Sequence, residues 1–432
     1  MKILFQTRRR AAEEGGGDYM ALGRTIEALR PLGVEGTVSN DPAQDLAPFD
    51  LVHLYGLADP FIALEYLLNA QRQSKPLVTT PIYWRHEQWL ASWDGVPSAL
   101  PALCALPPDE QARTRRVLRL EEQFSIAAHG LIVRAADMIF PLSEMEADIL
   151  EQDMQAPREK MRVTYNGVEP LYARGNAARF LARYQLRQPF VLSVARIEQR
   201  KNTLGLIRAW REEAVPVVLI GRTPDPRYLD LCRAEAPPHI YFPGALEPSQ
   251  VADACAAARV HVLASWWEEV GLSALEAGLA GCNLVMTQNG PGREYFGEFC
   301  FSCDPADGDS IRRAVYAALA APRQLALAAR IRGLFRWERA ARVLAEAYAE
   351  VLEQQPVSAT AANRRELMDL TDALAALWDL KEEHYALLSR RAAEQEAWTR
   401  ELLSILAVRE SERKRLLQFP PVQLARRLWR RV

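Results

Sequence analysis

The sequence predicts two α/β domains in tandem, each built on a doubly wound parallel sheet, followed by a helical extension. At 432 residues the chain is too long for a single hydrophobic core. Short apolar runs alternate with longer helical patterns, stop in a polar stretch at 172–188, and then start again. Past residue 352 the alternation gives way to a charged helical pattern at 363–417 that contains no glycine or proline.

The elements of the first domain are short strands with helices between them. Strands are expected at 2–7, 34–39, 51–56, 76–83, 136–143 and 162–167, and helices at 19–33 and 59–73. In the second domain strands are expected at 190–195, 215–221, 239–244, 260–265, 283–288 and 299–304. The helices between them are expected at 202–214, 226–236, 248–258, 271–280 and 307–320. These assignments place the domains at 1–172 and 173–335, a further helix at 336–352 and a linker at 353–362.

The remaining segments suggest assembly and surface binding. Leu367, Leu370, Leu374 and Leu377 fit two heptads of a coiled coil, so 363–417 is expected to join a second copy or a partner protein. Residues 409–432, which include a basic amphipathic tail at 418–432, hold eight Lys/Arg against two Glu. This end is expected to contact an anionic membrane surface. A solvated helix or a frayed terminus is the alternative, with about equal weight.

Composition limits the class of protein. The net charge of −2 provides no basic field for nucleic acid. The start "MKILFQT" is typical of a first strand rather than of a signal peptide, and no run of about 18 apolar residues occurs. We therefore expect a cytoplasmic protein, free or at the inner face of the cell membrane.

The stretch "WWEEVGLSALEAG" concentrates candidate binding groups. It follows an apolar strand, and a helix is expected to begin near Gly271. The backbone N–H groups of Gly271, Leu272 and Ser273 would then form an anion site at the helix N-terminus. Glu268 before the turn and Glu276 after it can accept hydrogen bonds from hydroxyl groups on both sides of that anion. Hydroxyl, phosphate and hydroxyl in this order describe a nucleotide sugar.

Two more loops at the carboxyl edge of the same sheet agree. Arg196 and Lys201 follow the domain's first strand and could neutralise a diphosphate. "NGPGREYFG" follows another strand and brings Gly292 and Glu294 to this edge. Each feature has a structural alternative: a solvated Arg–Lys pair, a surface acid at Glu276, and a first-turn acid at Glu294.

A metal site is not required by these residues. "DGD" at 307–309 resembles a metal-binding DxD sequence, but it precedes a helix. Asp307 or Asp309 is therefore expected to cap that helix.

These motifs resemble those of the retaining glycosyltransferases of family 4, which have the two-domain GT-B fold and belong to glycosyltransferase group 1. "EEVGLSALEAGLAG" resembles the E-x7-E signature of this family, and "VARIEQRKN" resembles its phosphate-binding segment. "NGPGREYFG" is similar to its glycine-rich turn, "GGGDYMALGRTIEAL" to its first loop and helix, and "ADMIFPLSEMEADIL" to the segment that closes the first domain. The resemblance covers roughly residues 1–352, and in this fold the last helix crosses back onto the first domain.

The resemblance implies a role for each matching residue. Arg196 and Lys201 would hold the donor diphosphate, Glu268 would contact the sugar and Glu276 the ribose. On the acceptor side Gly16 and Gly17 would border the cleft.

The sequence departs from the family at one place on the acceptor side. Tyr83 and Trp84 stand where many family members have a histidine near the reacting sugar, and His86 comes a few positions later. His53, at the end of another strand, could face the cleft or pack inside the domain.

The resemblance implies transfer of a hexose from a nucleoside diphosphate sugar to a glycan acceptor, lipid-linked and destined for a cell-surface polysaccharide. The anomeric configuration would be retained, and no cofactor or metal is expected. Two alternatives stay open: a phosphorylase or epimerase with the same fold, and a degenerate scaffold acting through its coiled coil. The donor base, the sugar, the acceptor and the linkage are not encoded in any motif that we recognise.

Overall fold

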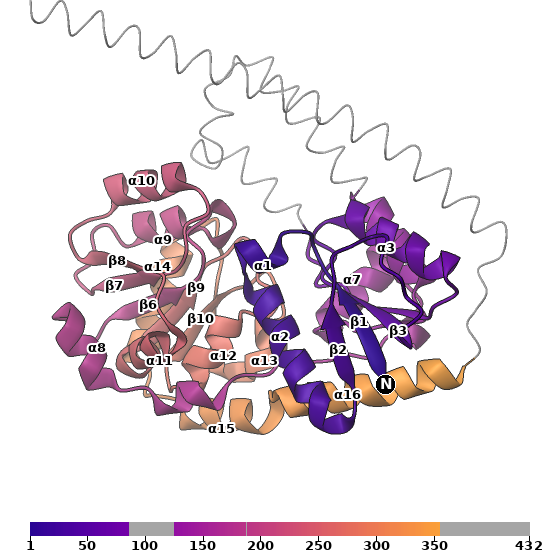
Figure 1. Ribbon diagram of the computed structural model, residues 1–432. Helices are drawn as coiled ribbons and strands as arrows, with labels where there is room; N and C mark the ends of the chain where they lie inside the picture. The colour runs from indigo at the N-terminus through magenta and orange to yellow at the C-terminus, as the bar shows by residue number, and fades with distance from the viewer. Residues whose placement is uncertain (86–124, 187, 355–432) are drawn as a thin grey trace, which may run out of the picture. The chain divides into compact units, whose positions relative to one another are not determined.

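The computed structural model describes residues 1–85, 125–186 and 188–354 (Figure 1). The chain divides into two compact units, Met1–Arg364 and Arg365–Val432. Every element described below belongs to the first unit. Among the residues described, no helix combines the length and the apolarity that spanning a bilayer requires.

Several sequence predictions lie outside the described residues. They are the linker at 353–362 apart from its first two residues, the coiled coil at 363–417, and the basic end at 409–432. His86 lies outside them as well.

The first sheet has the strand order β2-β1-β3-β4-β5, and all its strands are parallel. Its strands are β1 (Lys2–Gln6), β2 (Glu35–Val38), β3 (Leu51–Tyr55), β4 (Leu77–Thr80) and β5 (Met138–Ile139). The helices are α1 (Ala11–Glu14), α2 (Gly17–Leu29), α3 (Pro60–Arg72) and α7 (Glu144–Met154), with 3-10 turns η1 (Arg30–Leu32) and η3 (Arg158–Lys160). The predicted helices at 19–33 and 59–73 correspond to α2 and α3.

The strand predicted at 162–167 does not form. The segment runs beside β5 through a single bridge between Ile139 and Met161, and the backbone N–H of Thr164 donates to the Pro141 carbonyl at 2.8 Å. Because Pro141 has no N–H to donate, the ladder cannot continue past the two residues of β5. The sequence pattern was apolar enough for a strand, but its partner strand is too short.

The second sheet has the order β11-β10-β9-β6-β7-β8 and is also entirely parallel. Its strands are β6 (Val191–Val194), β7 (Val217–Ile220), β8 (Ile240–Gly244), β9 (Val260–Leu263), β10 (Asn283–Thr287) and β11 (Cys300–Cys303). The helices are α8 (Ala177–Tyr184), α9 (Thr203–Ala209), α10 (Pro226–Glu235), α11 (Pro248–Ala257), α12 (Leu272–Leu279), α13 (Gly292–Phe296), α14 (Gly308–Ala320), α15 (Leu325–Leu334) and α16 (Trp337–Glu353). The 3-10 turns are η4 (Pro170–Arg174), η5 (Gln199–Lys201) and η6 (Gly297–Phe299). The six predicted strands and five predicted helices of this domain are all present.

Only the helix predicted at 202–214 is markedly shorter than expected. α9 ends at Ala209, and the indole N–H of the next residue, Trp210, donates to the Val215 carbonyl at 2.7 Å. This bond turns the chain back toward β7 before the predicted helix end.

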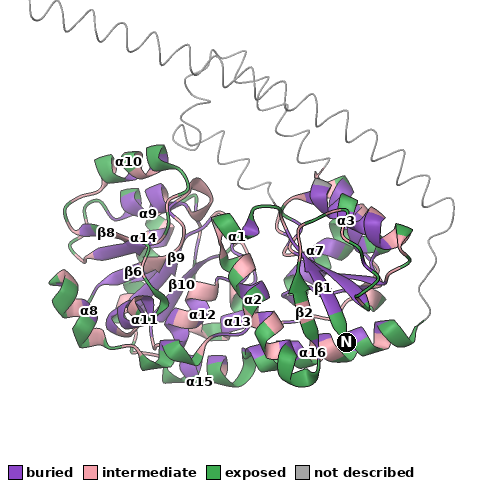
Figure 2. Ribbon diagram, in the orientation of Figure 1, coloured by how far each residue is buried: buried purple, intermediate pink, exposed green. Residues whose placement is uncertain are grey.

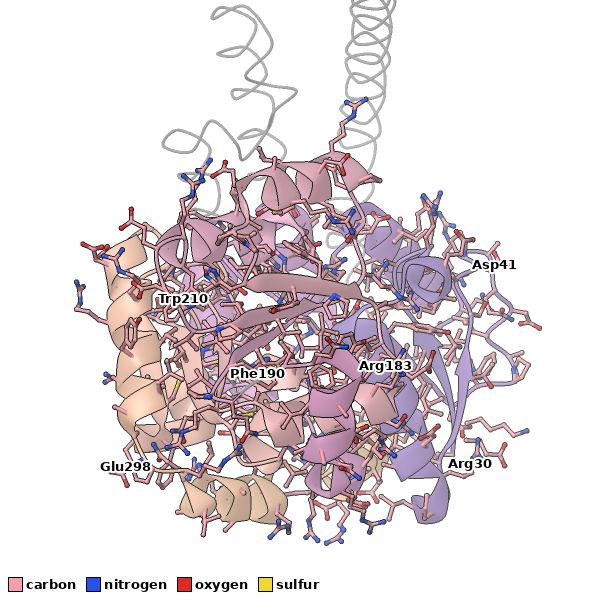
Figure 3. The ribbon with its side chains drawn as sticks, turned by 90° about the vertical axis from the view of Figure 1, so that its left-hand side faces the viewer. Arg30, Asp41, Arg183, Phe190, Trp210 and Glu298 are labelled. Carbon is pink, nitrogen blue, oxygen red and sulfur yellow. The ribbon has the colours of Figure 1, made fainter. Side chains whose placement is uncertain are left out.

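Apolar layers cover both faces of the second sheet. Figure 2 shows that most of its strands are buried. Phe190 belongs to the layer beneath α11 and α12, and Trp210 belongs to the layer beneath α9 and α14. Figure 3 shows both side chains inside this domain, and neither is exposed. The carboxyl ends of the strands are therefore the part of this sheet that is open to a ligand.

The last described helix, α16, packs on the first domain, as the resemblance implied. Its apolar face, which includes Trp337, Leu344 and Tyr348, shares a core with Ile3 and Phe5 of β1 (Figure 1). The Tyr348 hydroxyl lies 2.6 Å from Nδ1 of His53.

His53 is a packed strand residue. Its ring is fully buried, and its second nitrogen, Nε2, lies 2.9 Å from the Thr80 hydroxyl. Burial lowers the pKa of His53 to about 3, so the ring is neutral at physiological pH. Of the two roles left open by the sequence, the structure selects the packed one.

Candidate functional site

The predicted donor-binding residues meet where the strand order of the second sheet reverses. β6 lies between β9 and β7, so the chain continues to one side of β6 first and to the other side later. Ligands of doubly wound sheets bind beyond the carboxyl ends of the strands at such a switch point. The loop after β6 carries Arg196 and Lys201, and the loop after β9 carries Glu268.

Lys201 and Glu268 form a buried ion pair across these two loops. The Lys201 ammonium donates to both carboxylate oxygens of Glu268, at 2.8 and 2.6 Å. The Ser265 hydroxyl donates to the same carboxylate at 2.8 Å. Because an ammonium group has three N–H donors, one donor of Lys201 is left for an anion.

Charge keeps the Glu268 carboxyl ionised. Burial alone would raise the pKa of Glu268, but Lys201 and Arg200 outweigh burial and hold it below its usual value. A carboxylate of this kind can accept hydrogen bonds from sugar hydroxyls, but it has no proton to give as a general acid. The geometry therefore favours an orienting role for Glu268.

Arg200 adds a third cation that the sequence motifs did not single out. Its Nη1 donates to the Trp267 carbonyl at 3.3 Å, and its Nη2 lies 3.3 Å from Oε1 of Glu198. Arg196 shares the same Glu198 oxygen at 3.1 Å, with its side chain 38% exposed. Arg196, Arg200 and Lys201 therefore form one basic group around the loop after β6.

The helix N-terminus predicted beside Glu268 is present. α12 begins at Leu272, and Gly271 precedes it with φ 65°, in the left-handed region that favours glycine. A Cβ on Gly271 would lie 3.2 Å from Cγ of Glu268. Within the described residues, the backbone N–H groups of Gly271, Leu272 and Ser273 donate to no protein acceptor. These groups are suited to hold an anion.

Glu276 lies in the second turn of α12 and is partly exposed. Burial of its carboxyl raises the pKa of Glu276 to about 8, while a hydrogen bond from the Tyr172 hydroxyl opposes the rise. Glu169 adds negative charge nearby. Glu276 is thus a poorly solvated acid without a cationic partner, unlike Glu268.

The glycine-rich loop of the first domain faces this site. A Cβ on Gly17 would lie 3.5 Å from Cδ1 of Leu272, and a Cβ on Gly15 would lie 3.0 Å from the Arg222 guanidinium. Gly16 has φ 126°, and a Cβ there would lie 2.5 Å from Oδ1 of Asp18. Gly17 therefore borders the start of α12, whereas the atoms nearest a Cβ on Gly16 belong to Asp18 and Arg8 of its own domain.

Glu294 has a different environment from the one predicted. Its Oε1 accepts the Glu144 N–H at 2.7 Å, and its Oε2 accepts the Met145 N–H at 3.2 Å. The Tyr165 hydroxyl donates to Oε1 at 2.9 Å. Glu294 thus binds the first backbone N–H groups of α7, in the first domain, while Gly292 begins α13 on the edge near β10.

The side chains of Tyr83 and Trp84 lie in different environments. The Tyr83 side chain is 4% exposed and packs edge-on against His129, with ring centroids 5.4 Å apart. The Trp84 ring instead reaches the donor side, where the Arg200 guanidinium lies 5.4 Å from its centroid. Trp84 thus contacts the basic group after β6 by a cation–π interaction.

Two buried acids escaped the sequence analysis. Glu146 is fully buried and accepts the backbone N–H of Tyr83 at 2.7 Å and of Leu142 at 2.6 Å. Glu269, next to Glu268, accepts the Trp267 indole N–H at 3.2 Å and the Ser143 hydroxyl at 3.4 Å. A Ser-x-x-Glu capping box at 143–146 was readable in the sequence, but its inward-facing carboxyl was not.

"DGD" caps a helix, as predicted. Asp307 is the N-cap of α14, and its Oδ1 accepts the backbone N–H of Asp309 at 2.8 Å. Within the described part of the chain, no group of three or more His, Cys, Asp or Glu side chains is arranged to hold a metal ion.

Comparisons with known proteins agree with this architecture. Residues 179–332, which span most of the second domain, match the family Glycosyl transferases group 1. No curated protein matches the chain by sequence. The second domain is thus similar to the group 1 glycosyltransferases.

Solved structures with two such sheets are similar to the whole described unit. Sucrose-phosphate synthase from Thermosynechococcus elongatus is 18% identical, with 82% of this chain and 100% of that chain covered and a TM-score of 0.61. The Anabaena protein HepE, in complex with UDP and glucose, is 16% identical, with 81% and 99% covered and a TM-score of 0.56. WaaG, a glycosyltransferase involved in lipopolysaccharide biosynthesis, is 13% identical, with 82% and 99% covered and a TM-score of 0.53. The fold is therefore GT-B.

Proposed function

We propose that the protein is a retaining glycosyltransferase of family 4, which moves a hexose from a nucleoside diphosphate sugar to a glycan acceptor. The observation that carries the proposal is the Lys201–Glu268 pair beside the open N-terminus of α12, at the switch point of the sheet. The cations and the helix N-terminus are suited to bind the phosphates of a nucleotide sugar, and the ionised carboxylate is suited to bind the sugar hydroxyls that follow them.

In this proposal the donor is held in three places. Arg196, Lys201 and the N–H groups of Gly271–Ser273 bind the diphosphate. Glu276 accepts from the ribose, and Glu268 accepts from the hexose. The complex of HepE with UDP and glucose supports a donor of this chemical class.

Two further donor-side residues act less directly. We propose that Gly292 borders the donor, since it begins α13 in the loop after β10, at the same edge of the sheet. Glu294 would act by holding the start of α7, because its carboxylate is bonded there.

The chemical step needs stabilisation of the departing nucleoside diphosphate. The cations and the helix N-terminus supply preorganised positive charge, so we propose a reaction that needs no metal or cofactor. Glu268 is bonded to Lys201 and Ser265, which favours an orienting role over a nucleophilic one. We propose displacement on one face of the sugar, in which the leaving phosphate accepts the acceptor's proton. Detection of a covalent glycosyl-enzyme adduct by mass spectrometry would contradict this step.

We propose a lipid-linked acceptor and a role in cell-surface polysaccharide synthesis. The similarity in fold to WaaG supports this choice. The basic end at 409–432 would hold the protein on anionic lipid, and residues 363–417 would join a second copy or a partner. Deletion of 409–432 should abolish sedimentation with anionic vesicles, and retained sedimentation would remove the tail from the proposal.

A thermal-shift panel tests the function. GDP, UDP, dTDP, ADP and CMP are each added with and without EDTA to the wild type, to Arg196→Ala and to Arg183→Ala, an exposed arginine on α8. We expect one diphosphate to raise the melting temperature regardless of EDTA, an effect lost only in Arg196→Ala. No shift with any nucleotide would favour a scaffold instead. Turnover of a nucleotide sugar without an acceptor would favour an epimerase.

A further inference from the structure

A strained turn follows β4 and carries the two aromatic residues of the acceptor side. Ile82 has φ 54°, a left-handed conformation that is costly for a β-branched residue. Glu146 accepts the backbone N–H of Tyr83, the next residue, at 2.7 Å. This charge-assisted hydrogen bond helps to offset the strain of the turn.

Glu146 is itself fixed by the start of α7. The helix begins with Ser143 as N-cap, whose hydroxyl accepts the Glu146 N–H at 2.9 Å. The second carboxylate oxygen of Glu146 accepts the Leu142 N–H at 2.6 Å, and the side chain has no exposed surface. One buried carboxylate therefore joins the end of the β4 loop to the N-terminus of α7.

The turn delivers Trp84 to the donor side. The Trp84 ring lies over the Arg200 guanidinium, and Arg200 directly precedes Lys201 in η5. Arg200 is also bonded to the Trp267 carbonyl, one residue before Glu268. The indole therefore rests on the cation that connects the two donor-binding loops.

We propose that Glu146 is a positioning residue, whose ionised carboxylate fixes the Ile82–Trp84 turn so that the Trp84 indole covers Arg200 beside the Lys201–Glu268 pair. That this turn faces the acceptor rests on the proposed function. The placement of Trp84 by Glu146 does not, since it rests on the hydrogen bonds and the ring contact alone.

The carboxylate of Glu146 is ionised only over part of the physiological pH range. Burial raises the pKa of Glu146 to about 7, although the bonds from Leu142, Tyr83 and Ile82 oppose the rise. A protonated carboxyl presents an O–H to N–H groups that need an acceptor, so at least one of these bonds is lost. Below neutral pH the Ile82–Trp84 turn therefore loses at least one hydrogen bond to Glu146, and above neutral pH it keeps these bonds.

Among the described residues, the titratable side chains Glu269, Tyr55 and Tyr295 interact with Glu146, and His129 packs on Tyr83 in the turn. Burial and the Glu146 charge hold the pKa of Glu269 well above its usual value. His129, which packs on Tyr83, is the competing candidate for any titration sensed at Trp84.

Fluorine NMR of the nucleotide-free, full-length protein labelled with 5-fluorotryptophan tests the proposal. Trp84→Phe assigns the Trp84 resonance, which is then followed from about pH 5.5 to 8.5. We expect one transition with a midpoint near pH 7. Glu146→Gln should abolish the transition and leave the resonance at its acid position. Glu269→Gln and His129→Gln should keep the transition and its midpoint.

Other results would overturn the proposal. A flat Trp84 resonance in the wild type would show that no such linkage exists, and loss of the transition in His129→Gln or Glu269→Gln would assign it to another group. If Glu146→Gln does not fold, the wild type and these two variants still decide between the groups. The NMR titration contains no nucleotide, so a negative result would not affect the proposed function. A negative thermal-shift panel would likewise not affect the proposed role of Glu146.

Discussion

Two buried glutamates contact loops at the carboxyl ends of parallel strands, and they are stabilised in different ways: Glu268 belongs to the loop after β9, and Glu146, in α7, binds the loop after β4. After β9, Glu268 is paired with a cation, which keeps its pKa below the usual value. After β4, the carboxyl of Glu146 is held by backbone N–H groups, and its pKa lies at about 7. The cation therefore favours the ionised form of Glu268, whereas the charge of Glu146 changes with pH near neutrality.

The largest expected effect comes from breaking the buried pair after β9. Lys201→Ala leaves the Glu268 charge without its partner, so we expect the free energy of unfolding to fall by about 3–5 kcal/mol. Urea denaturation measures this loss. The double variant Lys201→Ala/Glu268→Ala should recover part of it, since no unpaired charge remains. A single variant as stable as the wild type would show that the pair does not hold the two loops together.

The next effect concerns Glu276, whose pKa is not lowered by a neighbouring cation among the described residues. The pKa of Glu276 is raised to about 8 in the folded protein, so its protonated form is favoured by folding. This stabilisation is complete below the unfolded pKa of about 4.5 and is lost as the pH rises through about 8.

Glu276→Gln removes this pH dependence. Relative to the wild type, the variant should gain roughly 2–4 kcal/mol of unfolding free energy between about pH 5 and pH 9. Denaturation at both pH values measures the gain. Glu346→Gln, at an exposed position of α16, is the matched control and should show no gain. Equal pH profiles for Glu276→Gln and the wild type would contradict a carboxyl whose pKa is raised by poor solvation.

A smaller loss is expected where the second domain caps a helix of the first. Glu294→Ala removes the acceptor for the Glu144 and Met145 N–H groups at the start of α7, at a cost of about 1–2 kcal/mol. Glu298→Ala, in the next turn of the chain, serves as a control with no such contact (Figure 3). Equal stability of the two variants would show that the cap contributes nothing.

The smallest effect is expected at an exposed ion pair on the same helix. Arg158 contacts Asp148 at 3.1 Å and also Glu144, but these side chains are substantially solvated. Arg158→Ala should change the free energy of unfolding by less than about 1 kcal/mol, and less still at high salt. A loss comparable to that of Lys201→Ala would mean that an exposed ion pair contributes as much to the free energy of unfolding as the buried pair.

The sequence was most informative for the second domain. Alternating apolar strands and helices predicted every strand of its sheet, and the loops after β6 and β9 carried the residues that meet there. Such charged residues are visible in a sequence because their type and their place after a strand suggest chemistry. The fold follows from periodic patterns that tertiary packing reinforces.

The remaining features depend on contacts between distant segments. Nothing local in the sequence indicates that Glu294 would bind the start of α7, or that Trp84 rather than Tyr83 would reach Arg200. The strand expected at 162–167 failed because its partner, β5, is only two residues long. The role of Glu146 depends on the backbone of a turn more than 60 residues earlier, since Tyr83 and Glu146 are 63 positions apart.

The most direct test of the central claim is isothermal titration of the donor nucleotide. The nucleoside diphosphate that gives the largest thermal shift would be titrated at pH 7 into the wild type, Arg196→Ala, Glu276→Ala and the control Arg183→Ala. We expect Arg196→Ala to lose roughly 10–100-fold in affinity, the value of one charged hydrogen bond, and the control to lose none. Glu276→Ala should lose roughly 3–10-fold, the value of a neutral hydrogen bond, because burial raises the pKa of Glu276 to about 8 and its carboxyl is mostly protonated at pH 7. Equal affinities in all four proteins, or no binding at all, would contradict a nucleotide-sugar site at the end of β6 and β9.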